Sequence, residues 1–174
     1  MEIICKDHFI SKYKVENFVQ IKKILMEKIN LIPTNPLNEL GQKISHTDWN
    51  LPTGFRREYL NIFQDEVLSK FIETQNKFWN AQLIIANIWF QVYRKGDFFK
   101  AHTHPNGNFT NVFFLHLPNK NLSTKLKAQD DVEINIDLDE GDILTIPAYL
   151  KHESPLISQD NEKYILSFNS SITT

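Results

Sequence analysis

Three histidines and one lysine in the second half of the chain are spaced in a way that suits metal chemistry. His102 and His104 lie two residues apart, His152 follows about fifty residues later, and Lys163 comes after it. The segments around them have the composition of β-strands, and alternate residues of a strand point to the same face. If a later strand brings His152 to that face, three imidazoles can hold one metal ion and leave positions open for substrate or oxygen. The sequence therefore predicts a metalloenzyme.

Turn-forming residues flank the first two histidines. A strand ends near Tyr93, Gly96 turns the chain, and a second short strand carries His102 and His104. Pro105 lacks a backbone N–H, which limits how far that second strand can pair. This arrangement favours two imidazoles presented together at the end of a strand.

The second cluster begins at Gly141-Asp142, continues as an apolar strand, breaks at Pro147 and reaches His152. A further strand then starts at Lys163. A lysine at the start of an apolar strand is costly to bury alone, whereas an anionic ligand beside a metal would stabilise it. Alternation predicts one face of this strand with four residues on it: Lys163, Ile165, Ser167 and Asn169.

The elements that must position these residues fall into two parts. Apolar residues recur at three- and four-residue steps over about 14–30 and 57–78, which predicts two amphipathic helices separated by a polar connection at 33–56. After residue 80, short β-branched and aromatic runs alternate with Gly, Pro, Asn and Asp, as in a sandwich or jelly roll. These runs are 82–93, 110–117, 132–138, 143–146 and 164–168.

The expected fold class is α+β, with a double-stranded β-helix core (jelly roll, cupin-like) and N-terminal helices packed on one sheet. We expect a single domain over residues 1–174, with a mainly helical part at 1–80 and the β-helix core at 81–174. The sequence contains no internal repeat or low-complexity tract that would divide the chain.

Composition narrows the function classes. The chain has 174 residues, a formal net charge of −2 and a single cysteine. Without a broad basic field, nucleic acid is an improbable partner, and no apolar run is long enough for a membrane span. The lone cysteine suits a reducing compartment, and no basic-then-apolar leader opens the chain. These features predict a soluble, cytoplasmic protein, and they leave the oligomeric state open.

With these residues the sequence resembles a known family, the Fe(II)- and 2-oxoglutarate-dependent oxygenases. The closest resemblance is to the prolyl-hydroxylase-like branch and its small phage-type members, and it covers roughly residues 82–172. The motif residues that carry it are Tyr93-x-x-Gly96, His102, Gly141-Asp142, Pro147, His152, and Lys163 ahead of Ser167-Phe168-Asn169.

The resemblance implies a cofactor set and a reaction. His102 and His152 match the two histidine ligands of Fe(II), Lys163 matches the basic residue that holds the far carboxylate of 2-oxoglutarate, and Tyr93 matches a tyrosine lining that pocket. A member of this family would consume 2-oxoglutarate and O₂, release succinate and CO₂, and in most cases hydroxylate its substrate. That substrate, a small molecule or a peptide side chain, is not identified by the sequence, because a shared core does not set the target.

The chain departs from the family pattern at two positions. Most members have a carboxylate where this chain has His104, so the resemblance leaves the third metal ligand open. A neutral imidazole there raises the charge of a ferrous site by one unit and should favour anionic ligands. Ile165 stands where some relatives have a hydroxyl residue that helps to bind the same carboxylate of 2-oxoglutarate.

Two other functions remain open. A cupin-type metalloprotein would use His102, His104 and His152 without 2-oxoglutarate, but residues 105–113 lack the glutamate of the first cupin motif, and Lys163 would have no role. A non-catalytic jelly-roll binding protein would carry the histidines incidentally.

Several other residues are expected to have structural roles or to line the pocket. The tripeptide His46-Thr-Asp48 fits the family's ligand motif, but it precedes a helix, so we expect a helix cap or a turn. Structural or surface roles are expected for His8 and His116. Five phenylalanines are candidates for the pocket walls: Phe98, Phe99, Phe109, Phe113 and Phe114.

Overall fold

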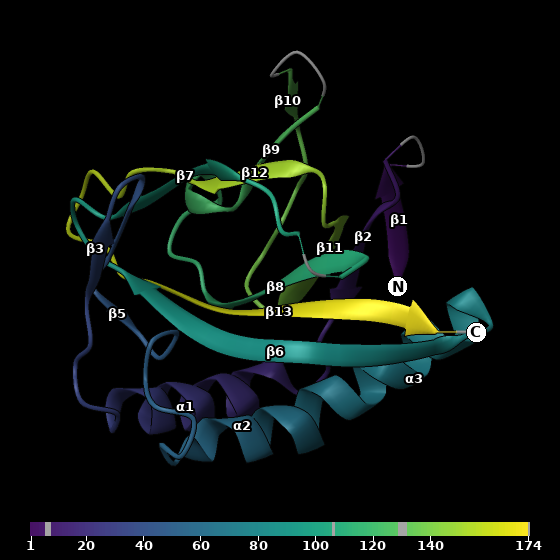
Figure 1. Cartoon of the computed structure of the whole chain (residues 1–174), viewed down its shortest axis with the longest axis horizontal. Helices are drawn as coiled ribbons and strands as arrows, with labels where there is room; N and C mark the ends of the chain where they lie inside the picture. Colours follow the sequence, from purple (N-terminus) through teal and green to yellow (C-terminus); the bar gives the residue numbers. More distant parts are fainter. Residues whose placement is uncertain (6–7, 106, 129–131, 174) are drawn as a thin grey trace.

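The computed structural model describes residues 1–5, 8–105, 107–128 and 132–173. Two antiparallel sheets face each other, and a layer of helices covers the outer side of the larger sheet (Figure 1). The described helices are too short or too polar to cross a bilayer.

The larger sheet has the strand order β1-β2-β11-β8-β13-β6-β5. Its longest strands, β6 and β13, pair from Gln82 opposite Thr173 to Tyr93 opposite Lys163, with a register shift between Asn169 and Ser170. The strand bounds are β1 Glu2–Cys5, β2 Ile10–Lys14, β5 His46–Thr47, β6 Gln82–Tyr93, β8 Phe109–His116, β11 Asp142–Pro147 and β13 Lys163–Thr173.

The smaller sheet has the order β10-β9-β12-β7-β4-β3 and lies over the inner face of the larger one (Figure 1). Its centre is the pair β7 and β12, which carries two of the three histidines. The strand bounds are β3 Leu37–Glu39, β4 Gln42–Ile44, β7 Phe98–His102, β9 Lys125–Lys127, β10 Glu133–Ile134 and β12 Lys151–Ser154.

The helices pack on the outer face of the larger sheet through apolar side chains at helical spacing. Ile21, Leu25 and Ile29 are the buried residues of α1 (Phe18–Asn30). Phe63, at the end of α2 (Glu58–Phe63), stacks on Phe113 of β8 with ring centroids 5.6 Å apart. A π-helical turn, η1 (Gln64–Leu68), joins α2 to α3 (Ser69–Trp79), and the short 3-10 helix η2 (Lys120–Leu122) lies elsewhere in the chain.

Strand β8 shows how one strand serves two cores. Phe113 and Leu115 belong to the core under the helices, whereas Val112 and Phe114 belong to the core between the two sheets. When both faces of a strand are buried in this way, its sequence is an unbroken apolar run and does not alternate between apolar and polar residues. The larger sheet is therefore a wall shared by two apolar layers, and its inner face looks toward the histidines.

The expected fold class is confirmed: mostly antiparallel sheets form a double-stranded β-helix, with the helices on one sheet. The expected helix over 57–78 is confirmed as a helical stretch over 58–79 in which a π-turn separates α2 from α3, and the first helix begins at Phe18 because Lys14 ends β2. Two local expectations were wrong. The expected strand over 132–138 is only the two-residue β10. The expected polar connection at 33–56 contains the edge strands β3, β4 and β5. The single domain over 1–174 stays a prediction.

Candidate metal centre and cavity

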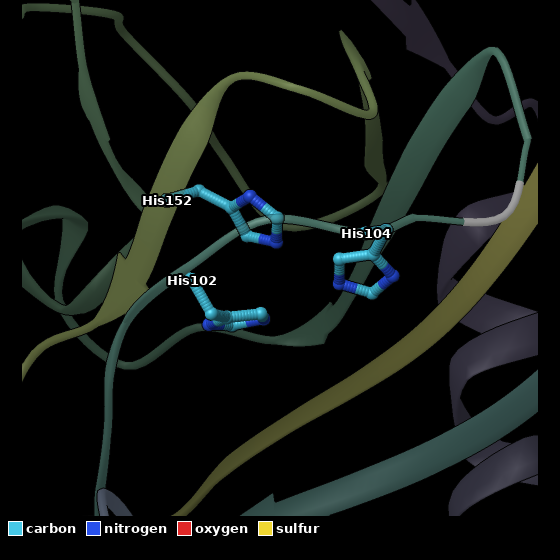
Figure 2. A group of neighbouring side chains, drawn as sticks. All are labelled: His102, His104 and His152. Atoms are coloured by element: carbon cyan, nitrogen blue, oxygen red, sulfur yellow. The ribbon is translucent and has the colours of Figure 1, made fainter.

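Neighbouring strands of the smaller sheet bring the first two imidazoles together. His102 of β7 is the register partner of His152 of β12, and residues directly opposite across antiparallel strands hold their side chains close together. His104 follows β7, where its backbone N–H donates to the carbonyl of Ala148, 2.9 Å away. One candidate ligand atom from each of the three rings lies within 4.8 Å of the others (Figure 2).

Backbone carbonyls fix the tautomers of two of these rings. His102 Nδ1 lies 2.8 Å from the carbonyl oxygen of Lys100, and His152 Nδ1 lies 3.0 Å from that of Leu150. A carbonyl only accepts, so each Nδ1 carries the proton and donates it. The Nε2 lone pair of each neutral ring is then left for a metal, which is the usual arrangement at protein metal sites.

Burial keeps all three imidazoles neutral. Desolvation, strengthened by the charge of His102, lowers the pKa of His152 to about 3 and that of His104 to about 4. Burial also lowers the pKa of His102 itself, against the opposing hydrogen bond to Lys100. Metal binding requires deprotonated ligands, so the site is ready for a divalent cation at neutral pH without releasing protons.

The third imidazole is oriented from the other sheet. The side chain of Asn169, on β13, hydrogen-bonds His104, which raises the pKa of that imidazole against the larger lowering by burial. Thr110 Oγ1 donates to Asn169 Oδ1 over 3.2 Å. One nitrogen of His104 faces the other two rings, while the second is turned toward the neighbouring strand (Figure 2). All three histidines are thus held by hydrogen bonds, which fits a metal site.

Lys163 lies in the wall beyond the histidines and is fully buried. Its Nζ donates to the carbonyl of Leu122 at 3.0 Å and to the hydroxyl of Ser154, and it sits 4.5 Å from the centroid of the Tyr93 ring. These described partners are all uncharged. Burial lowers the pKa of Lys163 to about 7 because no carboxylate offsets the loss of water.

Two connected spaces surround the histidines. A hollow of about 30 Å³ is lined by all three of them and by Tyr93 and Ser154, the residues that contact Lys163. A larger cavity of about 310 Å³ shares His102 and His104 with the hollow as lining residues. Its remaining lining residues are Leu37, Gln42, Ile44, Thr47, Trp49, Asn87, Trp89, Gln91, Phe99, Thr103, Pro105 and Asn169.

The structure places the sequence-derived candidates as follows. It brings together His102, His104 and His152, and sets Lys163 and Tyr93 against each other behind them. Among the five phenylalanines, Phe99 lines the cavity and stacks on His102 with ring centroids 3.8 Å apart. Phe109, Phe113 and Phe114 are buried in the two apolar cores.

The alternative tripeptide at His46 lies elsewhere. Asp48 is a buried anchor that accepts from Phe90 N at 2.9 Å, Tyr59 Oη at 2.6 Å and Arg57 Nε at 2.9 Å. The expected turn is confirmed, since Leu51 N donates to the Asp48 carbonyl at 3.2 Å, and the buried carboxylate also ties the chain after β5 to β6 and α2. His116 pairs with Glu140 away from the metal centre.

Sequence reasoning missed Ser154 as a partner of Lys163 and Asn169 as a partner of His104. A signal for Asn169 was present, since it alternates with Lys163, Ile165 and Ser167 on β13 and so faces the site. The same signal marked Ser154, which lies two residues after His152 on β12 and so shares its face.

No protein-family model matches the chain, and no curated protein matches it by sequence. Solved structures do match it. A prolyl-4-hydroxylase of Pseudomonas putida aligns with a TM-score of 0.65 at 15% identity, covering 93% of this chain and 92% of the other. An oxidoreductase of the 2OG-Fe(II) oxygenase family from Burkholderia pseudomallei gives a TM-score of 0.66 at 16% identity, covering 86% and 77%.

A third similar structure carries out a different reaction. The non-heme alpha-ketoglutarate-dependent epimerase SnoN, from nogalamycin biosynthesis, aligns with a TM-score of 0.64 at 10% identity over 90% of this chain and 76% of that one. Identities this low establish the fold and leave the reaction to the site itself. The chain therefore has the double-stranded β-helix fold of the Fe(II)- and 2-oxoglutarate-dependent oxygenases, as the resemblance in its sequence predicted.

Proposed function

We propose that this protein is an Fe(II)/2-oxoglutarate-dependent dioxygenase. His102, His104 and His152 would hold Fe(II), and Lys163, backed by Tyr93, would bind the distal carboxylate of 2-oxoglutarate. When bound, the metal and cosubstrate would supply the activation of O₂, with succinate and CO₂ as co-products. A cytoplasmic location belongs to the same proposal and rests on the single cysteine, Cys5.

The observation that carries this proposal is the pairing of a three-imidazole cluster with a buried lysine behind it. The cluster offers neutral nitrogen ligands, which suit iron. A lysine buried among neutral partners is destabilising on its own, and an entering carboxylate would restore its charge. A site that bound only metal would have no use for Lys163, so the cupin-type alternative is not favoured.

Different groups of the chain orient the three imidazoles and hold Lys163. The carbonyls of Lys100 and Leu150 orient two imidazoles, and Asn169 orients the third. Ser154 holds the Nζ of Lys163 at the edge of the hollow. That hollow, at about 30 Å³, is smaller than a five-carbon diacid. The proposal therefore requires its lining side chains to move apart when 2-oxoglutarate enters.

The reaction proposed is hydroxylation of an uncharacterised substrate C–H bond. Support comes from the prolyl-4-hydroxylase among the similar structures, while the epimerase shows that the same fold also serves another outcome. The larger cavity of about 310 Å³ would admit the substrate next to His102 and His104. Its size is at the lower end of that of small-molecule sites.

The test is anaerobic titration of the full chain with Fe(II) and then 2-oxoglutarate. A chelate of 2-oxoglutarate on Fe(II) gives a weak visible charge-transfer band, which we expect for the unmodified protein. Lys163→Ala should abolish that band at moderate 2-oxoglutarate while leaving metal content intact. If metal binds but 2-oxoglutarate produces neither a band nor a thermal shift, the dioxygenase proposal is wrong and the cupin-type reading replaces it.

A further inference from the structure

The inner face of the β6–β13 pair presents a ladder of side chains that runs past the metal centre. Four register pairs point the same way, because alternate residues of a strand share a face. From one end to the other they are Lys163 with Tyr93, Ile165 with Gln91, Ser167 with Trp89, and Asn169 with Asn87.

The two ends of the ladder carry different functional groups. At one end Lys163 supplies a basic amine, and its partner Ser154 lines the small hollow. The other end is an asparagine pair, Asn87 and Asn169, and both of these line the larger cavity. The lysine end is the one that suits a carboxylate, so the amide end is left for the other ligand of the site.

The amides at this end are set to donate. Asn169 Oδ1 accepts from Thr110 Oγ1 at 3.2 Å, and Gln91 Oε1 accepts from Ser167 Oγ at 3.2 Å. With its oxygen occupied, each carboxamide has its NH₂ group left to serve a ligand. Asn87, which is exposed, adds both a donor and an acceptor at the mouth.

Aromatic rings form the wall beside these amides. Trp89 is buried, and Trp49, at 55% exposure, packs edge-on against it with ring centroids 4.7 Å apart. Planar or aliphatic groups lie well against indole faces. A half-exposed indole at the mouth of a cavity is available to a ligand in a way that a core tryptophan is not.

Charge is missing from this cavity. Among its described lining residues there is no Asp, Glu, Lys or Arg. A phosphate, carboxylate or ammonium would lose water here without gaining a counter-charge, which costs several kcal/mol per ion. An uncharged amide would exchange its hydrogen bonds with water for bonds to carboxamides.

Resting on the proposed function, we infer that the substrate group taken into this cavity is an uncharged amide, held by Asn87, Gln91 and Asn169 against Trp49 and Trp89. The amide can belong to a peptide or to a small molecule such as a lactam. The absence of basic lining residues argues against a phosphate-bearing substrate.

The test uses the full chain loaded with Zn(II) and 2-oxoglutarate, with intrinsic fluorescence as the readout, because two of the three tryptophans line the cavity. The probes are N-acetyl-leucinamide and N-acetyl-glutaminamide for the peptide arm and 2-piperidone for the small-molecule arm. Free leucine, free glutamine and thymidine 5′-monophosphate are the charged counterparts. We expect at least one amide probe to bind tenfold or more tighter than every charged compound.

Asn87→Ala should weaken binding of that amide probe by about 2- to 10-fold, the loss expected for one hydrogen bond. Asn87 is exposed, so this change should leave folding intact. Asn38→Ala is the matched control, since Asn38 is an exposed asparagine on β3 outside the cavity lining. It should leave the affinity unchanged.

The inference is overturned if charged probes bind as tightly as amides, if no amide binds, or if Asn87→Ala has the same effect as Asn38→Ala. Its failure is distinct from failure of the proposed function. A visible Fe(II)–2-oxoglutarate band together with no preference for amides would remove the substrate class and leave the dioxygenase standing.

Discussion

His102 and His152 face each other as paired residues of β7 and β12, with ring centroids 4.3 Å apart. The metal centre is therefore a property of strand register. A slip of one residue between these two strands would turn one imidazole to the opposite face of the sheet. The extra residue of the bulge that follows lies in β7, since two steps along β12 from His152 to Ser154 pair with three along β7 from His102 to Phe99.

Removal of either paired histidine should eliminate tight metal binding. We expect His102→Ala and His152→Ala each to weaken binding of Ni(II) or Zn(II) by at least a hundredfold, measured by calorimetry on the metal-free protein. Each change leaves two imidazoles, which are too few to hold the ion. His8→Ala is the control, because His8 is not part of the cluster. Unchanged metal content in both cluster variants would contradict the proposed site.

The Asn169–His104 contact predicts that Asn169 controls the third ligand. Partners that orient a metal-binding histidine typically contribute 10- to 100-fold in affinity. Asn169→Ala should therefore lower metal affinity by about that much, whereas Asn87→Ala, across the strand pair, should not.

The same contact allows a sharper test. In a His104→Asp background the ligand is a carboxylate that has no N–H to donate, so Asn169→Ala should cost little. An equal loss in both backgrounds would show that Asn169 acts on folding rather than through His104. Retention of metal in both His104→Ala and His104→Asp would show that residue 104 is not a ligand.

Sequence reasoning recovered the parts of the site that follow strand alternation. His102, His152 and Lys163 were identified because a two-residue period and turn-forming residues fix which side chains share a face. Partners from other elements were missed: Leu122, in η2, contacts Lys163 across 41 positions. Such pairings depend on how the sheets close, which periodicity does not encode.

The edge strands were missed for the same reason. Strands β3, β4 and β5 span three, three and two residues, too short for any alternation to be visible in the sequence. Strand β4 pairs with β7 and β3, strand β5 pairs with β6, and the three supply one wall of the cavity. The π-turn at Gln64–Leu68 leaves the apolar spacing of its flanking helices nearly intact, so one continuous helix was the natural interpretation.

Replacing Lys163 by methionine should stabilise the ligand-free protein and abolish 2-oxoglutarate binding. The buried ammonium lacks a charged partner among its described contacts, and its stem fits a methionine. Apolar replacement of buried charges has stabilised proteins by roughly 1–4 kcal/mol. Chemical denaturation would measure the gain. Lower stability of Lys163→Met would mean that the bonds to Leu122 and Ser154 outweigh the cost of burial.

The lowered pKa of Lys163 also predicts a pH signature. Between its folded value of about 7 and its unfolded value near 10.5, the unfolded chain binds the extra proton. Stability of the ligand-free protein should therefore rise with pH across this window through Lys163. The difference in free energy of unfolding between Lys163→Met and the unmodified protein should shrink from pH 7 to pH 10. A constant difference would show that Lys163 does not titrate there.

Metal affinity should be nearly independent of pH from 7 down to about 5.5. The folded pKa values of His104, about 4, and His152, about 3, lie below this range, and that of His102 is also lowered. Protons therefore compete little with the metal. Three ordinary imidazoles, with pKa values near 6.5, would lose several hundredfold in affinity over the same interval.

Calorimetric titration with Zn(II) at pH 7.0, 6.2 and 5.5 would measure this, and we expect less than a tenfold change. The stability of the metal-free protein, by contrast, should depend on pH. The unfolded chain takes up protons on these histidines below pH 6.5 while the folded chain does not, so the free energy of unfolding should fall as the pH drops toward 4. A steep loss of metal affinity already at pH 6 would mean that the three rings are solvated rather than buried together.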